Sequence, residues 1–384
     1  MVRVFLLSHG FQQEYEVGYA NGLAAHGDCE VTLISSENTL TERLAPNVKV
    51  LQLRGSQRPG RGFVKKSINM VRYWVLYLSL SINNRDAIFH FNGLFSMRAR
   101  LMVLVEAVLA WMLIRKWVLS VHNIVPHESE GTIDKLLYRF VYKLPGLLVV
   151  HTELMRQVLI SDFDVCESRI VVVEHGIDVF SELPYETRAH ARHSLLGIDD
   201  CKKVILSFGK VMRYKGLEEF IEAFARYRGP SDDWILVIAG KCDDVDLRNS
   251  LRSRIVNWNL SSRVVWLDRF IESSEVEGLL CAADVMIMPY RHIDQSGVIF
   301  SALSFGLPVV ATDVGSLKHY VPLSGGAVVG SVVSEDFIRA IRNTLHKISW
   351  LDRGNTINSA KVKYGWRTVL TPLISSYSNA SCLQ

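Results

Sequence analysis

The stretch SFGKVMRYKGLEEFIEAF, residues 207–224, is the most informative part of the sequence about the fold. It runs from the end of an apolar strand, through a short loop with three cations, into an amphipathic helix. The loop holds Lys210, Arg213 and Lys215, and we expect Gly216 to open the helix. A helix that starts there directs its first N–H groups and its dipole toward the loop, which makes an anion site. A solvated charged loop is the alternative, but ligands collect at the carboxyl ends of such strands.

The same alternation of strands and helices extends in both directions from this stretch. Short apolar runs separated by longer helical patterns are typical of parallel sheets covered on both faces. The predicted strands are 2–8, 29–36, 48–53, 87–92, 117–122, 146–152, 169–176, 203–209, 234–240, 263–268, 285–290, 307–312 and 326–330.

A polar segment, 177–203, interrupts this pattern, and 384 residues are too many for one typical domain. We therefore expect an α/β protein with two Rossmann-like doubly wound domains that face each other across a cleft. The predicted parts are an N-terminal domain (1–178), a linker (179–200), a C-terminal domain (201–360) and a C-terminal helix returning to the N-terminal domain (361–384).

Composition narrows the class of protein. The apolar fraction of 49% and the charged fraction of 21% argue against disorder. The six cysteines form no CxxC or zinc spacing, which favours reduced thiols in a cytoplasmic protein. The segments 68–82 and 101–114 are too short to span a membrane. We predict buried helices there, with a membrane-surface role as the alternative.

Positive charge is concentrated in one part of the chain. Residues 43–143 hold 16 Lys or Arg and 5 Asp or Glu, although the net charge of the whole chain is only +4. Within 54–66 there are five cations and no anion, which indicates either a solvated loop or a patch facing anionic lipid or a pyrophosphate-bearing acceptor. Peripheral membrane contact would use Arg54, Arg58, Arg61, Lys65 and Lys66. No nucleic-acid recognition motif accompanies the patch.

A second helix start points to the same region. In DQSGVIFSALSFGLPVVATDVG (294–315), Ser296 is a good N-cap and Gly297 allows close approach of a ligand to the backbone. Two helix N-termini and three cations fit a diphosphate better than a single phosphate. The chain has no GxxxxGK[ST] and no GxGxxG after its first strand, which argues against a P-loop and against a dinucleotide oxidoreductase. No DxD-type pair is prominent, so we expect neither a metal nor a resident cofactor.

These motifs together carry a resemblance. The second half closely resembles the retaining GT-B glycosyltransferases of family four, group 1, of the type that builds bacterial polysaccharides. The matching pieces are 207–224, WILVIAG (234–240), VVWLDRFIESSEVEGLLCAADVMIMPY (264–290) and SGVIFSALSFGLPVVATDVGSLKHYV (296–321). The first half is similar more loosely, through residues 9–35 and 169–178.

The resemblance implies roles for individual residues. Lys210 and Lys215 occupy the two cationic positions that bind the donor diphosphate. The family usually has arginine at the position of Lys210, and lysine keeps the charge but loses the bidentate geometry, so Arg213 would make up the difference. The resemblance places Phe270 and Ile271 at the nucleotide base.

In the first half, the resemblance implies that His122 lies near the donor sugar and the reacting centre. Gly10 would line the cleft opposite the donor. His9 is either an acceptor contact or an ordinary histidine at a strand end.

The sequence departs from the family at its two glutamates, which lie eight residues apart. Their slots hold Ile293 and Ser301. Asp294, beside Gln295, would replace the first glutamate after a shift of one residue, and Ser301 would donate to the ribose. Alternatively, the backbone of residues 296–298 (Ser296, Gly297 and Val298) holds the donor.

The stretch VHNIVPHESEG (121–131) places two histidines and a glutamate close together. A metal site is disfavoured because Pro126 breaks any helix through His122 and His127, and HExxH is absent. His127 and Glu128 either serve the acceptor, with Glu128 as the best candidate base, or cap the following helix.

We therefore predict a hexosyltransferase that moves a sugar from a nucleotide-diphosphate sugar to a saccharide acceptor. We expect the acceptor to be lipid-linked, the product to be a bacterial surface polysaccharide, and the enzyme to be cytoplasmic or peripheral on the inner face of the plasma membrane. A two-lobed nucleotide-sugar binding protein without turnover and a GT-B epimerase are the alternatives.

Overall fold

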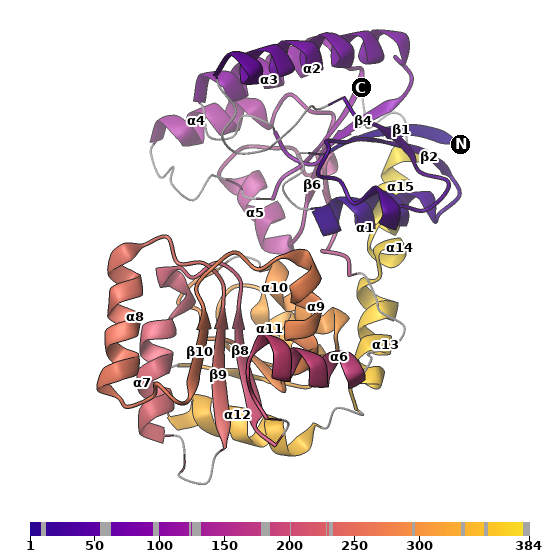
Figure 1. Cartoon of the computed structure of the whole chain (residues 1–384). Coiled ribbons are helices and arrows are strands. Elements are labelled where there is room, and N and C mark those ends of the chain that lie inside the picture. The colour runs from indigo at the N-terminus through magenta and orange to yellow at the C-terminus, as the bar shows by residue number, and fades with distance from the viewer. Residues whose placement is uncertain are drawn as a thin grey trace. The chain divides into compact units, whose positions relative to one another are not determined.

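The chain folds into two α/β units in a computed structural model (Figure 1). Unit 1 comprises Met1–Gly176 and Tyr364–Gln384, and unit 2 comprises Ile177–Lys363. The structure describes residues 1–8, 13–53, 63–94, 100–122, 124, 132–177, 185–199, 201–227, 229, 233–293, 296–331, 335–348 and 352–378.

Unit 1 is built on a seven-stranded sheet whose strands are all parallel, in the order β3-β2-β1-β4-β5-β6-β7. The order reverses between β1 and β4. The strands are β1 (Val2–Leu7), β2 (Cys29–Ile34), β3 (Lys49–Leu51), β4 (Ile88–Phe91), β5 (Lys116–Ser120), β6 (Leu147–Val150) and β7 (Ile170–Val172).

Helices cover both faces of this sheet. Strand residues of alternate parity, such as Phe5 and Phe89, pack with Tyr77, Val103 and Tyr138 into the larger core, so α2, α3 and α4 share one face. Helices α1, α14 and α15 lie against the other (Figure 1). The helices of unit 1 are α1 (Gln13–Ala24), α2 (Phe63–Asn83), α3 (Arg100–Leu113), α4 (Thr132–Val141), α5 (Glu153–Ser161), α14 (Trp366–Val369) and α15 (Thr371–Ser378).

Unit 2 repeats the architecture with a parallel sheet of six strands, in the order β10-β9-β8-β11-β12-β13. The strands are β8 (Lys203–Phe208), β9 (Trp234–Ala239), β10 (Val264–Leu267), β11 (Val285–Met288), β12 (Val309–Thr312) and β13 (Ala327–Val329). The helices are α6 (Tyr185–His190), α7 (Leu217–Tyr227), α8 (Val245–Asn257), α9 (Ser273–Ala282), α10 (Gly297–Ser304), α11 (Leu317–Tyr320), α12 (Glu335–Lys347) and α13 (Arg353–Tyr364). The two predicted Rossmann-like domains are confirmed.

The segment predicted as a linker belongs to unit 2 where it is described. Helix α6 continues into a π-helical turn, Ala191–Leu195, and both carry arginines that reach Asp284, just before strand β11. Asp284 accepts hydrogen bonds from Arg188 and Arg192, each at 2.7 Å, and all three side chains are largely buried. Burial acts to raise the pKa of the Asp284 carboxyl, but the two guanidinium groups outweigh it and hold that pKa below its usual value. These ion pairs tie the segment to the sheet.

The C-terminal segment is held in unit 1 by Trp366. A Cβ atom on Gly18 would lie 1.9 Å from the Trp366 indole nitrogen, and one on Gly176 would lie 2.2 Å from its ring. The indole therefore fits only because these two positions lack side chains. Tyr377 of α15 adds a hydrogen bond to His90 in β4.

Helices α2 and α3 differ from the prediction that both are buried. Each buries only the stripe that faces the sheet, with Tyr77 and Val103 among the buried residues, while Val71 is 63% and Met112 is 68% exposed. Hydropathy predicts burial here because it reports composition and not which side of a helix is covered. Within the part of the chain that the structure describes, no helix is long and apolar enough to cross a membrane.

We expect Asp284→Asn to destabilise unit 2 by about 3–5 kcal/mol, because it removes the carboxylate that two buried guanidinium groups share. The stabilisation by Asp284 should be fully present above the ordinary pKa of an aspartate. It should be lost as the pH falls through the lowered pKa that Asp284 has in the folded state. Urea unfolding followed by near-ultraviolet circular dichroism measures it. Asp336→Asn, which removes an exposed pair with Arg339, is the control and should leave the midpoint unchanged. An unchanged midpoint for Asp284→Asn would contradict the structural role.

Candidate active site

The cationic loop of unit 2 lies where the order of its sheet reverses. Strands β8 and β11 are neighbours with crossovers leaving in opposite directions, and open α/β sheets bind ligands beyond the carboxyl ends of such a pair. The segment after β8 contains Lys210 and Lys215, and the segment after β11 leads to α10. The topology therefore brings the two predicted anion-binding stretches to one edge.

Lys215 is the centre of this edge. Its side chain is buried, its Nζ donates to the carbonyl of Phe208 at 2.8 Å, and it lies 5.8 Å from the centre of the Tyr290 ring. Burial lowers the pKa of Lys215 to about 8. No described carboxylate pairs with this ammonium. Its charge is therefore not neutralised by the described residues of the protein.

Gly209 brings the ammonium and helix α10 together. Its backbone is left-handed, with φ of 88°, and a Cβ there would lie 3.1 Å from Lys215 Nζ and 3.5 Å from Val298 Cγ2. The first turn of α10 thus lies beside Lys215, and a Cβ added to Gly297 would meet no atom within 4 Å. The helix dipole and the ammonium add positive potential to the same open space.

The Ser296 side chain differs from the prediction. It makes no capping hydrogen bond to α10, although it is buried at the N-cap position. Its hydroxyl instead faces Tyr290 and acts to lower the pKa of that phenol, which burial raises. Tertiary packing has redirected a residue whose local preference is to cap.

The other two cations of the loop have protein partners. Lys210 pairs with Asp243 at 2.9 Å, and Lys241 pairs with the same carboxylate, so the pKa of Asp243 falls to about 2 through hydrogen bonds from Lys241 and Lys210. Arg213 donates twice to Asp244, at 2.8 and 3.1 Å. Asp244 also caps α8, and Gly216 turns the chain in a left-handed conformation so that α7 begins at Leu217. These two cations are exposed, and a ligand would have to compete for them.

The remaining predicted donor residues occupy varied environments. Phe270 is 70% exposed just after β10, whereas Ile271 beside it is buried. Ile293 and Ser301 are both half-buried, and Ser301 lies on α10. Asp294 and Gln295 lie outside the described residues.

In unit 1, four neighbouring strands each carry a histidine in or just beyond their carboxyl-terminal half. His90 lies in β4, His122 follows β5, His151 follows β6 and His175 follows β7. The Tyr15 ring of α1 packs edge-on against His122 and His151, with ring centres 5.1 and 5.8 Å apart. Burial lowers the pKa of His151, and that of His90 and His175 to about 3. These three imidazoles are therefore neutral at ordinary pH.

The contacts of His151 assign the protons in this cluster. Its Nδ1 lies 2.9 Å from the carbonyl of Val173, so Nδ1 must carry the hydrogen. A neutral ring then has a lone pair on Nε2, which faces His122 Nδ1 at 3.2 Å and the Tyr15 hydroxyl at 3.4 Å. His122 therefore donates from Nδ1, which leaves Nε2 as the nitrogen that carries the lone pair in the neutral form of the ring. A half-buried imidazole of fixed tautomer can accept a hydrogen bond or a proton at one defined atom.

Sequence reasoning missed His151 as well as Asn92. Asn92 follows β4 and is 5% exposed, and neither its amide nitrogen nor its oxygen has a hydrogen-bond partner among the described residues. A position just after a predicted strand was a usable signal for both residues, because Asn92 follows β4 and His151 follows β6, as His122 follows β5. Of the other predicted residues of unit 1, His9, Gly10, His127 and Glu128 lie outside the described residues.

The same holds for the basic patch of residues 54–66, whose cationic side chains are not described. Among the histidines, cysteines and carboxylates that are described, no group of three is arranged to hold a metal ion.

Comparison with known families matches both units. A family model described as Glycosyltransferase Family 4 matches residues 16–179, and one described as Glycosyl transferases group 1 matches residues 202–347. Each model covers most of one α/β unit, so together they account for the greater part of the chain.

Individual relatives agree with these families. The chain is 27% identical to the lipopolysaccharide core biosynthesis mannosyltransferase LpsB of Rhizobium meliloti (strain 1021), over 44% of this chain and 48% of the relative. It is 32% identical to a D-inositol 3-phosphate glycosyltransferase of Corynebacterium jeikeium (strain K411), over 55% of this chain and 53% of the relative. The chain thus spans about half the length of these curated relatives.

Solved structures share the fold. Anabaena Alr3699/HepE in complex with UDP aligns with a TM-score of 0.70, at 16% identity, over 99% of this chain and 100% of that one. Sucrose-phosphate synthase from Thermosynechococcus elongatus aligns with a TM-score of 0.71, at 16% identity and over the full length of both chains.

We expect His151→Phe to release the tautomer of His122, because the phenyl ring keeps the packing but removes the acceptor for Nδ1–H. A hydrogen bond of about 1 kcal/mol corresponds to a roughly fivefold preference for one tautomer. The ¹⁵N chemical shifts of the His122 ring should report a predominantly Nδ1-protonated imidazole in the wild type and a mixture in the variant. His151→Gln, which retains an acceptor oxygen, is the control. An Nε2-protonated His122 in the wild type would disprove the assignment.

Proposed function

The chain belongs to the group 1 glycosyl transferases of family 4, with a GT-B fold, and we propose that it transfers a sugar from a nucleotide-diphosphate sugar to a saccharide acceptor. The observation that carries the proposal is the buried Lys215 ammonium beside the first turn of α10, at the switch point of the unit 2 sheet. A diphosphate supplies the negative charge that this site lacks.

The proposed chemistry requires stabilisation of a leaving group. When the sugar leaves, negative charge grows on the nucleoside diphosphate, and preorganised cations and helix N-termini lower the energy of that state. Lys215 and α10 are in place before the donor arrives, and Lys210 can turn from Asp243 to the phosphates. Because these groups can neutralise the leaving group, we propose a metal-independent reaction. We propose retention of anomeric configuration from the family alone.

The relatives support the class of both substrates. The solved Alr3699/HepE complexes contain UDP and UDP-glucose, which supports a nucleotide-sugar donor. The relative LpsB is named for lipopolysaccharide core biosynthesis and mannosyl transfer, which supports hexosyl transfer to a surface glycan. We accordingly propose a lipid-linked saccharide acceptor, with the reaction on the cytoplasmic side at the inner face of the plasma membrane.

Unit 1 would supply the groups that meet the sugars. We propose His122 as the contact to the transferred sugar, because it follows β5 at the carboxyl edge of the unit 1 sheet and the hydrogen bond between its Nδ1 and His151 holds its ring in place. Asn92, with an amide that can both donate and accept, is a further sugar-binding candidate at the switch point between β1 and β4. Glu128 and His127 remain candidates for the acceptor side.

We expect one of the UDP-, GDP-, ADP- or dTDP-sugars to raise the melting temperature, since a ligand at about 100 times its Kd stabilises by about 2.7 kcal/mol. Radiolabel from that donor should move into a lipid extract. His122→Ala should keep the melting shift and lose the transfer. Absence of a shift with every donor would disprove the donor site, and normal transfer by His122→Ala would disprove the role of the histidine. Donor binding without transfer or hydrolysis by the wild type would identify a binding protein.

We expect the affinity for the nucleoside diphosphate to fall as the pH rises through about 8, because Lys215 loses its proton there. Above that pH the Kd should rise by up to about tenfold per unit. Isothermal titration calorimetry between pH 7 and about 9.5 measures it. Lys215→Met should bind more weakly and without this dependence, whereas Lys210→Met should keep it. A wild-type Kd that does not change across this range would contradict the assignment.

A further inference from the structure

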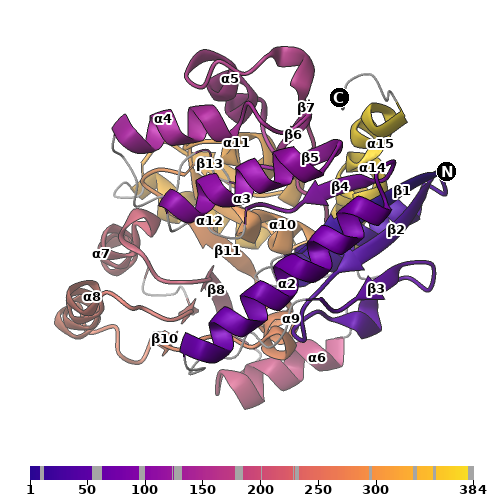
Figure 2. The same cartoon turned by 90° about the horizontal axis from the view of Figure 1, so that it is seen from above.

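Helices α2, α3 and α4 form a layer in unit 1 whose outer surface is apolar. The three helices lie side by side over one face of the sheet, as Figure 2 shows from above. Monomeric proteins scatter their exposed apolar side chains, and a continuous apolar surface indicates a partner.

The outer side of α3 carries no polar side chain among its described residues. Met102, Val105, Trp111 and Met112 are 38–68% exposed. The one carboxylate of the helix, Glu106, is buried. A helix that faced only water would place its charged residues outward, whereas α3 is apolar on its outer side as well and buries its one carboxylate.

Helices α2 and α4 extend this surface on both sides. On α2, Ile68, Val71, Val75 and Ile82 follow one another at helical spacing and are 51–63% exposed. On α4, Ile133, Leu136 and Phe140 are 48–66% exposed. The apolar surface therefore spans three helices that are separate in sequence.

The charges of this layer are sorted by sign. The carboxylates Glu106 and Asp134 are buried, whereas Arg72, Lys135 and Arg139 are exposed. Among the described side chains of the three helices, all exposed charges are therefore positive. The combination of outward apolar residues with cations only is that of helices that lie on an anionic lipid surface.

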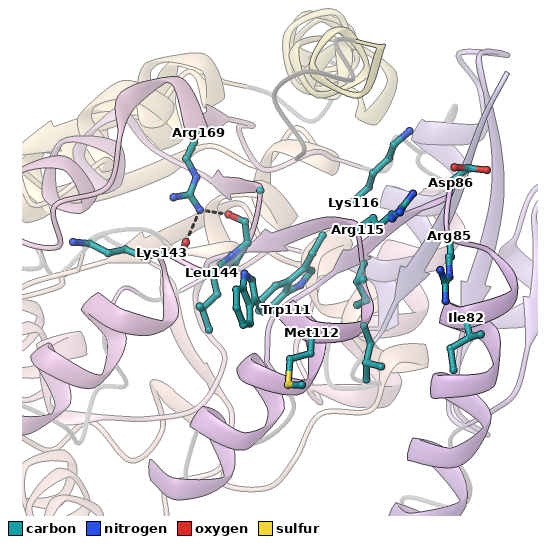
Figure 3. A pocket seen from close by; sticks show the side chains of 15 residues that line it. Ile82, Arg85, Asp86, Trp111, Met112, Arg115, Lys116, Lys143, Leu144 and Arg169 are labelled. Carbon is teal, nitrogen blue, oxygen red and sulfur yellow. Dashed lines mark hydrogen bonds between the residues drawn. The ribbon is translucent and has the colours of Figure 1, made fainter.

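A groove at the edge of the layer adds further cations. Ile82, Trp111 and Met112 belong both to the apolar surface and to the lining of this groove, which also contains Arg85, Arg115 and Lys116 (Figure 3). None of these three cations forms an ion pair with a described residue, and Asp86 is the only carboxylate among the lining residues that the structure describes.

The far wall of the groove contains Lys143 and Arg169. Arg169 donates to the backbone carbonyls of Lys143 and Pro145, which holds that wall in place. The groove lies where strands β5 to β7 begin, at the edge of the sheet opposite to His122 and His151. It is therefore separate from the residues assigned to the reaction in unit 1.

We propose that the outer face of α2, α3 and α4 rests on an anionic lipid bilayer and that the groove binds the phosphates of its headgroups. Trp111 and Met112 would lie at the interface between headgroups and acyl chains, where aromatic side chains concentrate. The cations of the groove, beside them, would meet the headgroup phosphates. This deepens the proposed function, because it would hold the enzyme where a lipid-linked acceptor is found.

A second copy of the chain is a poorer occupant of this surface. Such a contact would bring the same cations of both copies together, with one carboxylate in each groove to offset them. An anionic bilayer would match both the exposed apolar side chains and the cations of this surface.

Flotation of the full chain with phosphatidylcholine vesicles, with and without phosphatidylglycerol, tests the proposal. The wild type should float with the anionic vesicles and stay in solution with the neutral ones. Trp111→Gln with Met112→Gln should weaken binding by at least about tenfold. Arg85→Gln with Arg115→Gln should weaken it by roughly 30-fold and reduce its dependence on phosphatidylglycerol.

Matched substitutions in unit 2 are the controls. Val256→Gln with Trp258→Gln removes exposed apolar residues, and Lys347→Gln with Lys361→Gln removes exposed cations. Both should bind vesicles as the wild type does. A wild type that does not float, or groove and helix variants that float normally, would overturn the proposal. Sedimentation that shows a dimer dissociated by the Trp111 and Met112 substitutions would assign the surface to a second copy instead.

The test separates this proposal from the proposed function. Vesicle binding requires no nucleotide sugar, and the melting shift with a nucleotide sugar requires no vesicle. The variants of α3 and of the groove should keep the wild-type melting shift. Loss of that shift in the wild type would count against the donor site and leave the membrane surface standing.

Discussion

Every strand in both sheets is parallel, and this determines where the functional side chains collect. A parallel strand reaches its neighbour only through a crossover, so all carboxyl ends collect at one edge of a sheet and all amino ends at the other. In unit 1 the first edge gathers His122, His151 and Asn92, and the second gathers the cations of the groove. One sheet thus offers two surfaces of different chemistry without mixing them.

The buried charges of unit 2 show how structural and functional ions differ. Asp284 is buried against two guanidinium groups, so the desolvation of all three is offset within the protein. Lys215 is also buried, but its ammonium contacts a backbone carbonyl and an aromatic ring and pairs with no described carboxylate, and burial lowers its pKa. A buried charge that the protein leaves without a counter-ion is a feature of ligand sites. Asp284 and Lys215 are both buried and ionisable, so it is the charges around each residue, and not its burial, that distinguish the structural role from the functional one.

Much of the fold could be predicted because its signals are local. The apolar runs and turn residues that mark each strand lie within a few residues of each other, and β8 was expected at 203–209 and is found at Lys203–Phe208. The loop with Lys215 and the start of α10 were likewise readable as anion-binding elements. The ion pairs that hold the described residues 185–199 to Asp284, just before β11, could not be predicted because they join residues more than 90 positions apart.

The parallel α/β units, their order and the cationic loop could be predicted without coordinates, since strand and helix patterns and helix N-termini are properties of neighbouring residues. The role of each polar group, by contrast, was set by how the chain folds in space. The tertiary structure paired Arg213 with Asp244, turned Ser296 toward Tyr290, and placed Tyr15 against His151 across 136 positions of sequence. It also decided that α2 and α3 cover the sheet with one side only. The physical reason is that hydrogen bonds and burial depend on distances in space, and a periodic pattern cannot state which distant groups a fold brings within 3 Å.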